Sequence, residues 1–216
     1  MDCADPPSCL RKGLEALGLP LSEAAQKKLL DYLDLLERWN RVHHLTAIRN
    51  KRDMVIRHLL DSLSIAPYVE GERVLDVGTG PGLPGIPLAV ALPEKRFVLL
   101  DSASKKVRFL RHGVVMLGLS NVRVVQARVE DYHPQEPFDT LVARAFSDIP
   151  TLLARVRHLM HPGSVLLAMK GRHPAEEIGA LPQDFRLLGV EPLKVPGLEG
   201  ERHLVRIALS PCEVCL

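Results

Sequence analysis

The hydrophobic positions in the first third of the chain recur at helical spacing. Leu10–Leu17 can form two helical turns, and Ser22 is placed to cap a longer helix. A polar stretch over residues 40–50 follows that helix, and Asn50 then predicts the start of a third helix, which Pro67 ends. The apolar face of the long helix consists of Ala25, Leu29, Tyr32 or Leu33, Leu36 and Trp39.

From Arg73 onward the pattern changes to short apolar runs that alternate with helical segments. Such alternation predicts a parallel sheet with helices on both faces. Leu187–Val195 and His203–Leu209 have no helix between them, so they predict an antiparallel final pair. The other predicted strands are Arg73–Val77, Phe97–Leu100, Val122–Val125, Thr140–Ala143 and Val165–Met169, and the predicted helices are Pro84–Leu92, Val107–Leu117, Ile149–Leu159 and Ala175–Leu181.

The change of pattern near Pro67 to Gly71 gives the expected domain organisation. We expect an N-terminal tail and short helix over 1–19, a helical extension over 20–70, an α/β domain over 71–209 and a C-terminal tail over 210–216.

The composition is that of an ordinary globular protein, with 216 residues of which 46% are hydrophobic and 25% charged. No stretch approaches the roughly 20 apolar residues of a membrane helix. The first ten residues are acidic and contain prolines, unlike a signal peptide. We therefore expect a cytoplasmic protein that does not contact membranes. One CxxC without a second pair does not complete a zinc site, so no metal is expected; the four cysteines are Cys3, Cys9, Cys212 and Cys215.

The charge is nearly balanced, with 28 Lys and Arg against 26 Asp and Glu, which by itself does not indicate a nucleic-acid-binding protein. Aromatic residues make up only 4%, which argues against stacking many bases on aromatic side chains. Cations nevertheless cluster. Residues 38–58 hold six Lys and Arg and one acid, and residues 105–111 hold four and no acid. Each cluster either binds a phosphate backbone or is a solvated helix face.

A glycine-rich run, VLDVGTGPGLPG over residues 74–85, is the main candidate site. A strand leads into turns without side chains and then into a helix N-terminus, where backbone amides favour a negatively charged group. Read from Gly80, the spacing also satisfies GxGxxG, the dinucleotide-binding motif. Asp76 inside the run instead resembles the first motif of S-adenosylmethionine-dependent methyltransferases, whose acidic residue helps to position the amino acid portion of the cofactor. A helix-capping aspartate with ligand-free turn glycines is the structural alternative.

Polar residues at the ends of the following strands extend this candidate site. Asp101 can accept hydrogen bonds from both ribose hydroxyls of either type of cofactor. Val129 and Glu130 can bind an adenine edge, or their segment is a solvated acidic turn. Arg144 stands where methyltransferases of exocyclic amines carry an Asn/Asp-Pro-Pro-aromatic motif. An arginine there suits a phosphate, a carboxylate or a base edge.

Longer runs resemble those of one family, RsmG, also called glucose-inhibited division protein B, the bacterial guanine-N7 methyltransferases of small-subunit rRNA. The resemblance covers about residues 20–209 and excludes all four cysteines. The matching runs are Arg38–Asn40, Asn50–Ser62 with Arg57–Ser62 inside it, Asp76–Leu88, Arg108–Arg111, Arg144–Phe146, Lys170–Gly171 and Gly200–Leu204.

This resemblance implies transfer of a methyl group from S-adenosyl-L-methionine to N7 of one guanine, position 527, in the decoding-region loop of 16S rRNA. It also implies a Rossmann-like methyltransferase fold with a seven-stranded, mostly parallel sheet, an antiparallel last strand and the helical extension. The implied cofactor-binding residues are Gly78, Leu83, Val129, Glu130, Arg144 and Asp101, to which the glycine run adds Asp76 and Gly80.

Guanine N7 has a free lone pair, so no general base is required, and we expect catalysis by alignment of the reacting groups. We therefore assign no acid–base residue. Arg144 and Lys170 are expected to hold the nucleotide, and Arg57, His58 and Arg202 to support the RNA or the geometry of the site. The expected partner of this monomer is 16S rRNA or the small ribosomal subunit.

Three alternatives explain part of the sequence. A methyltransferase of a small molecule gives the cluster at 38–58 no role. A nicotinamide-dependent oxidoreductase leaves Asp76 unexplained. A non-enzymatic RNA chaperone would not need so complete a glycine run.

Overall fold

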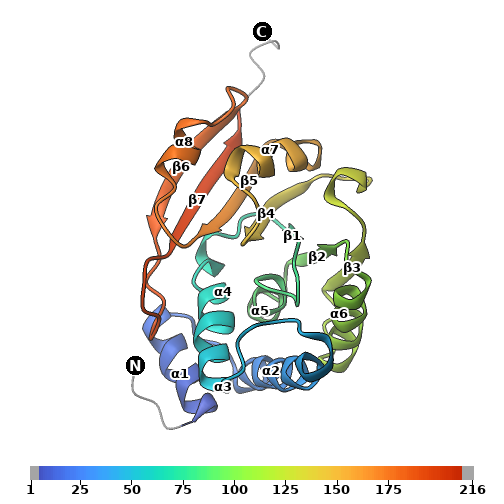
Figure 1. Cartoon of the computed structure of the whole chain (residues 1–216), viewed down its shortest axis with the longest axis vertical. Helices are drawn as coiled ribbons and strands as arrows, with labels where there is room; N and C mark the ends of the chain where they lie inside the picture. The colour runs from blue at the N-terminus through green and yellow to red at the C-terminus, as the bar shows by residue number, and fades with distance from the viewer. Residues whose placement is uncertain (1–4, 211–216) are drawn as a thin grey trace.

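The computed structural model describes residues 5–210, which leaves Cys3, Cys212 and Cys215 outside the described part (Figure 1). Seven strands form one sheet in the order β3-β2-β1-β4-β5-β7-β6. The first five are parallel, and β7 is antiparallel to both of its neighbours, as predicted. The strands are β1 (Arg73–Val77), β2 (Arg96–Asp101), β3 (Val122–Gln126), β4 (Phe138–Arg144), β5 (Met160–Lys170), β6 (Phe185–Pro192) and β7 (His203–Leu209).

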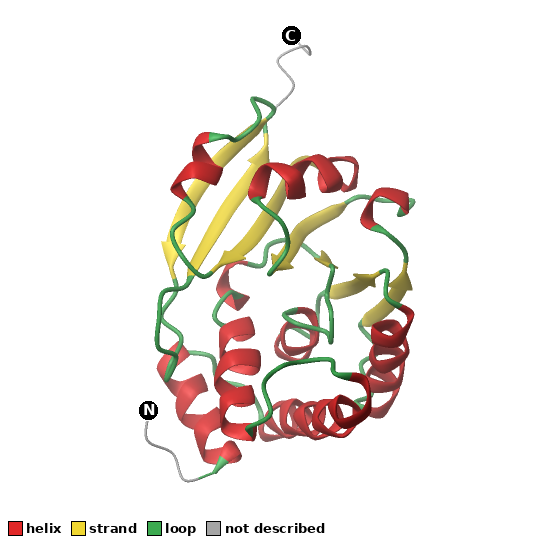
Figure 2. Cartoon of the chain, viewed as in Figure 1, coloured by secondary structure: helices red, strands yellow, loops and turns green. Residues whose placement is uncertain are grey.

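Helices cover the two faces of this sheet (Figure 2). On one face α7 (Ile149–Val156) packs over β4 and β5, with α8 (Ala175–Gly179) beside it. On the other face lie α5 (Gly85–Ala91) and α6 (Ser104–Met116), and the N-terminal helices pack against these two. None of the helices in residues 5–210 has the length and apolarity that crossing a membrane requires.

The N-terminal helices are α1 (Pro6–Leu17), α2 (Glu23–His43), α3 (Lys51–Met54) and α4 (Asp61–Leu63). The predicted start of the first helix at Leu10 is wrong by four residues. Asp5 caps this helix by accepting from Ser8 N, and prolines are compatible with a first turn. The cap at Ser22 is confirmed, since its side chain accepts from Ala25 N.

One hydrophobic cluster joins the N-terminal helices to the α/β part. Leu29 and Leu36 of α2 and Leu59 are fully buried in the same cluster as Leu99 of β2 and Phe109 of α6. The expected boundary near residue 70 lies just before β1, but the core is continuous across it. The helical extension and the sheet therefore stabilise each other.

The third predicted helix contains a π-helical stretch over Val55–Leu60, between α3 and α4. Asn50 caps it by accepting from the backbone of Arg52 and Asp53, as predicted. π-helical turns are rare and occur often at functional sites. Here the stretch carries two of the predicted site residues, Arg57 and His58.

Strand and helix ends in the C-terminal half differ from prediction. β5 begins at Met160, five residues before the predicted Val165. Pro162 and Gly163 have low strand propensity, so the sequence pattern did not predict a strand there. The helix predicted to reach Leu159 ends at Val156 and continues as a 3₁₀ turn. α8 ends two residues before the predicted Leu181.

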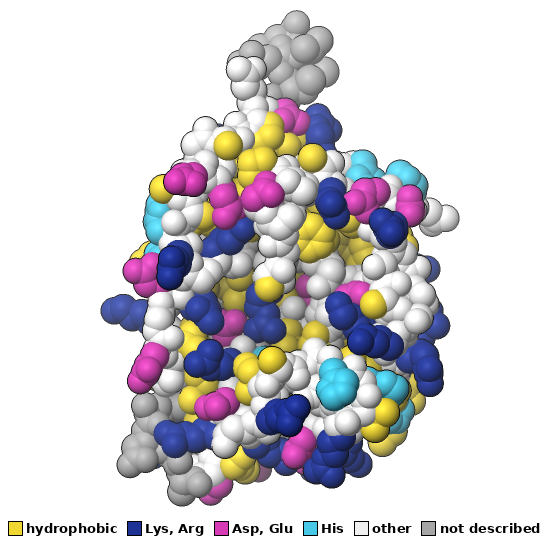
Figure 3. Space-filling view, in the orientation of Figure 1, with side chains coloured by type: hydrophobic (Ala, Val, Ile, Leu, Met, Phe, Trp, Pro, Cys, Tyr) yellow, Lys and Arg dark blue, Asp and Glu magenta, His cyan; other side chains and the backbone are white. Residues whose placement is uncertain are grey.

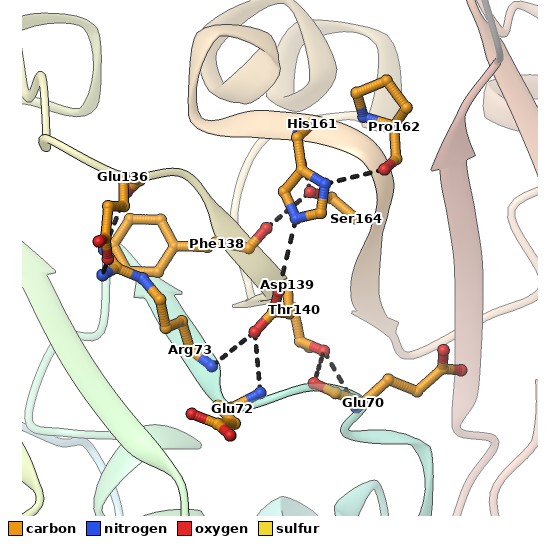
Figure 4. Close-up of polar contacts among 10 residues, drawn as sticks. All are labelled: Glu70, Glu72, Arg73, Glu136, Phe138, Asp139, Thr140, His161, Pro162 and Ser164. Atoms are coloured by element: carbon orange, nitrogen blue, oxygen red, sulfur yellow. Dashed lines mark hydrogen bonds and ion pairs between the residues drawn. The ribbon is translucent and has the colours of Figure 1, made fainter.

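A polar cluster fixes the segment that enters β1, at the end of the sheet opposite to the glycine run (Figure 4). Oδ2 of Asp139 accepts from the backbone N–H groups of Glu72 and Arg73, both at 2.8 Å. His161 Nε2 lies 3.4 Å from Oδ1. Burial raises the pKa of Asp139, but these donors outweigh it and leave the pKa below its ordinary value. The cluster around Asp139 therefore stabilises the start of β1, at the end of the sheet far from the glycine run.

Candidate active site

The glycine run follows β1 as predicted and leads into α5. Gly78, Gly80 and Gly82 have φ angles of +65°, +63° and +99°, a region that favours glycine. Gly80 N donates to Asp101 Oδ2 at 2.9 Å, which fixes the turn to the end of β2. The glycine loop and the Asp101 carboxylate are therefore held together by a direct hydrogen bond.

Asp76 is fully buried beneath this loop. Its Oδ2 accepts from Thr79 Oγ1 at 2.5 Å and from Gly85 N at 2.7 Å, so it joins the two ends of the loop. Burial raises the pKa of Asp76 to about 6, although these donors and the Arg144 charge act to lower it. Its Oδ1 is buried and has no hydrogen-bond partner within residues 5–210. Only that oxygen remains for the predicted contact with a cofactor.

A cavity of about 410 Å³ opens beside the glycine run at the carboxyl ends of the strands, and we call it the loop cavity. Four predicted cofactor residues line it, Gly78, Asp101, Val129 and Glu130. Sequence reasoning assigned no cofactor contact to the other polar residues of its wall, which are Ser102, Lys106, Arg128 and Arg155.

The remaining predicted cofactor residues lie elsewhere. Leu83 is 3% exposed and belongs to the hydrophobic core under the loop. Gly80, Asp76 and Leu83 do not line the loop cavity, and Arg144 lies on a neighbouring one. The carboxylate of Glu130 forms an ion pair with Arg155 at 3.2 Å. Of the predicted cofactor residues, four therefore line the loop cavity, Arg144 lines the neighbouring one, and the other three line neither.

The neighbouring cavity has a volume of about 390 Å³, and we call it the cation cavity. It brings together all five predicted substrate-holding residues, which are Arg57, His58, Arg144, Lys170 and Arg202. They come from the π-helical stretch, the ends of β4 and β5, and the segment before β7. Ala145 and Phe146 line both the cation cavity and the loop cavity, so the two adjoin at the end of β4.

The wall between the two cavities is tightly built. Ala145 has φ +54°, which is strained for a residue with a Cβ and occurs preferentially at functional sites. A Cβ placed on Gly78 would lie 3.0 Å from the Phe146 ring. The Phe146 ring therefore lies close against the Gly78 backbone, where a side chain at position 78 would not fit without a shift.

Asp61 connects the arginines of the cation cavity. Its Oδ2 accepts from Arg144 Nη1 and its Oδ1 from Arg202 Nε, each at 3.0 Å. Asp61 lies within one of the runs that resemble the family, but the sequence pattern assigns it no role. The only available signal was an acid inside an apolar helical pattern. Lys170 is held separately, by Glu177 at 2.7 Å.

His58 is 5% exposed, and its Nε2 lies 2.9 Å from Thr46 Oγ1. Its Nδ1 is buried and has no hydrogen-bond partner in the described part of the chain. Burial, followed by the positive charge of Arg144, lowers the pKa of His58 to about 4. The imidazole is therefore neutral near pH 7.

This depressed pKa predicts a pH-dependent stability. Between pH 6.5 and about 4 the unfolded chain binds a proton at His58 and the folded protein does not. The contribution of His58 to the free energy of unfolding should therefore fall by about 3 kcal/mol as the pH drops through this window, while Asp76, whose pKa is raised, contributes a change of the opposite sign in every variant. Urea unfolding at several pH values measures the fall. It should be smaller in His58→Asn and unchanged in His158→Asn, which alters an exposed histidine. Equal falls in all three proteins would contradict the assignment.

The N-terminal helices also support the glycine loop. Tyr32 of α2 is fully buried, and its hydroxyl donates to Pro81 O at 2.9 Å. Burial raises the pKa of Tyr32, so the hydroxyl keeps its proton. Sequence reasoning placed Tyr32 only on an apolar face.

Tyr32→Phe should weaken binding of S-adenosylmethionine about fivefold, because it removes one hydrogen bond, worth about 1 kcal/mol, that holds the glycine loop in place. Calorimetric titration measures this change. Tyr68→Phe is the matched control, since Tyr68 packs under Arg206 and away from the loop. An unchanged affinity in Tyr32→Phe would show that the loop does not need this bond.

Lys and Arg side chains spread across the centre of the face in Figure 3, between the sheet and the N-terminal helices. The two predicted clusters approach each other, since Lys105 Nζ lies 3.5 Å from His43 O. Lys106 instead turns toward the loop cavity, where its Nζ lies 3.3 Å from Asp101 Oδ2. Within residues 5–210, no group of three His, Cys, Asp or Glu side chains is placed to hold a metal ion.

Comparison with solved structures supports the fold. The chain is similar to TrmN from Thermus thermophilus, with a TM-score of 0.54 and 24% identity over 69% of this chain and 47% of that one. It is also similar to the glycopeptide N-methyltransferase MtfA in complex with S-adenosylmethionine, with a TM-score of 0.59 and 13% identity over 71% and 88%. These similarities confirm the predicted Rossmann-like methyltransferase fold.

Sequence comparison is more specific. The family profile described as "GidB: rRNA small subunit methyltransferase G" matches residues 25–205. The chain is 52% identical to the ribosomal RNA small subunit methyltransferase G of Nitrosococcus oceani, over 92% of each chain. It is 51% identical to that of Ectopseudomonas mendocina, over 93% of this chain and 95% of the relative. The chain belongs to the GidB family of rRNA small subunit methyltransferases.

Proposed function

We propose that the protein transfers a methyl group from S-adenosyl-L-methionine to N7 of a guanine in 16S rRNA, at position 527 of the decoding-region loop. One observation carries this proposal. The loop cavity, bounded by the glycine run and Asp101, adjoins the cation cavity, and the two meet at Ala145 and Phe146. A methyl donor and an anionic methyl acceptor can meet at that wall.

The residues present fit the proposed cofactor. Asp101 offers a carboxylate to the ribose hydroxyls, and the backbone of Val129 and Glu130 offers polar groups to an adenine. The buried, unpartnered Oδ1 of Asp76 suits a positively charged amino group. The volume of the loop cavity, about 410 Å³, lies within the range usual for small-molecule sites. The cofactor supplies an electrophilic methyl group on a sulfonium.

The protein's part in the reaction is to hold and orient the guanine. N7 attacks with its own lone pair, so no side chain has to remove a proton. Arg144, Lys170 and Arg202 can donate to guanine O6 or to phosphate oxygens, which fixes the position of N7. Neutral His58 adds no further charge. Phe146 and Met169 give the cation cavity an apolar wall that limits water.

We also propose that RNA is bound mainly through charge and shape. Further cations lie in the N-terminal part of the chain, where Arg41 of α2 and Arg49 of the loop that follows it line another hollow. The resulting enzyme would be a cytoplasmic monomer that acts on naked 16S rRNA or on the small subunit. Sedimentation of the purified chain tests the monomer, and assays with both RNA forms identify the substrate.

The decisive experiment uses 16S rRNA and small subunits from cells that lack this gene. We would incubate them with the protein and radiolabelled S-adenosylmethionine, then detect N7-methylguanine by borohydride and aniline cleavage. A single cleavage in the decoding-region loop is the expected result. Cofactor binding without label in either RNA, and without salt-dependent RNA binding, would favour the small-molecule methyltransferase.

A further inference from the structure

We infer that Asp61 is a positioning residue for the methyl acceptor, because it fixes the guanidinium groups of Arg144 and Arg202 relative to each other. The inference rests on the proposed function, since it assigns a role in the same RNA site. Asp61 would act through the two arginines and would not touch the cofactor.

The geometry joins three distant parts of the chain at one carboxylate. Asp61 lies in α4, Arg144 ends β4, and Arg202 precedes β7. The side chain of Asp61 is 4% exposed, against 21% for Arg144 and 27% for Arg202. Each carboxylate oxygen accepts one N–H at 3.0 Å, so the two arginines do not compete for the same oxygen.

These bonds determine which donors of the arginines face the substrate. Arg144 uses Nη1 for Asp61 and for Arg57 O. Arg202 uses Nε for Asp61 and Nη1 for Glu201 O. A guanidinium has five N–H donors in a rigid plane, so fixing some of them also fixes the rest. The remaining donors of both arginines then point in set directions at the cation cavity.

The negative charge is as important as the shape. The cation cavity is lined by Arg57, Arg144, Lys170 and Arg202, and Asp61 is its one lining acid among the described residues. An asparagine has the same shape, but its amide nitrogen is a donor and would face one of the guanidinium donors. Without the carboxylate, the two arginines would also repel each other. Asp61→Asn should therefore let them separate.

The test compares Asp61→Asn with Asp31→Asn, which removes an exposed carboxylate paired with Lys27 on α2. We expect Asp61→Asn to lower kcat about 20-fold at saturating rRNA and cofactor and to leave cofactor affinity unchanged. Asp31→Asn should keep wild-type kcat. Unchanged kcat in Asp61→Asn would overturn the inference. Asp61→Glu, which keeps the charge, should recover several-fold of the loss, and equal loss in both variants would contradict the positioning role.

A double-mutant cycle separates positioning from general damage. In a variant that already carries Arg144→Ala and Arg202→Ala, adding Asp61→Asn should change kcat by less than threefold. A further 20-fold loss would mean that Asp61 acts independently of the arginines. If the wild-type protein transfers no methyl group to rRNA, the proposed function fails. In that case, binding of an rRNA fragment tests the inference. Asp61→Asn is expected to weaken this binding, and Asp31→Asn is not.

Discussion

Arg144→Ala should lower kcat/KM for rRNA methylation by roughly two to three orders of magnitude, the effect expected for loss of a preorganised charged donor in an active site. Arg144 is the residue that reaches the cation cavity from the end of β4, directly before the wall formed by Ala145 and Phe146. Its loss removes a donor from the acceptor site and leaves Asp61 with one guanidinium in place of two. The measurement is methyl transfer to rRNA from radiolabelled cofactor.

The controls for Arg144→Ala separate chemistry from folding. Arg186→Ala removes an exposed arginine of β6 and should keep wild-type activity. Arg144→Lys keeps the charge but not the planar fork, so it should recover little activity. The far-ultraviolet circular dichroism spectrum should be unchanged in all three variants, and titration with S-adenosylmethionine tests separately whether Arg144 also contacts the cofactor, as the resemblance implies. Wild-type turnover in Arg144→Ala would contradict its assignment to the acceptor site.

Asp101→Asn should weaken binding of S-adenosylmethionine about 100-fold. Asp101 is 6% exposed, and its Oδ2 accepts from Gly80 N while Oδ1 accepts from Ala103 N. The substitution places an amide nitrogen against one of these N–H groups and removes a charged acceptor for the ribose hydroxyls. Two charge-assisted hydrogen bonds together account for about 3 kcal/mol, which corresponds to about 100-fold in Kd.

Isothermal titration with S-adenosylmethionine measures this loss, and Asp131→Asn is the control. Asp131 is an exposed acid in the turn after β3, outside the lining of the loop cavity, so its substitution should leave the affinity unchanged. If Asp101→Asn binds as tightly as the wild-type protein, Asp101 does not hold the ribose. A loss of similar size in Asp131→Asn would instead indicate a general effect of charge.

The sequence predicted those features that depend on local pattern and on parallel topology. Asn50 and Ser22 cap helices because the cap bonds join neighbours in the chain. Arg144 and Lys170 meet in one cavity because the carboxyl ends of parallel strands share one edge of the sheet. The glycine run was recognisable because its turns require positive φ angles at fixed spacing.

The residues that sequence reasoning missed act over long separations. Tyr32 reaches a carbonyl 49 residues away, and Asp61 reaches arginines 83 and 141 residues away. Such bonds depend on how the helices pack on the sheet, which periodicity alone does not determine. The side chain of Leu83 lies in the core, so a contact between Leu83 and the cofactor stays a prediction from the resemblance and would involve its backbone.

The strand order has a consequence for folding during synthesis. β7 is the last strand to be made, yet it lies between β5 and β6. Until residues 203–209 have emerged, β5 has an uncovered edge and β6 has no neighbour in the sheet. Unpaired edges of this kind template pairing with other chains. A nascent chain that pauses between β6 and β7 would therefore be at its most prone to aggregate, and would be at that moment a natural client for a chaperone.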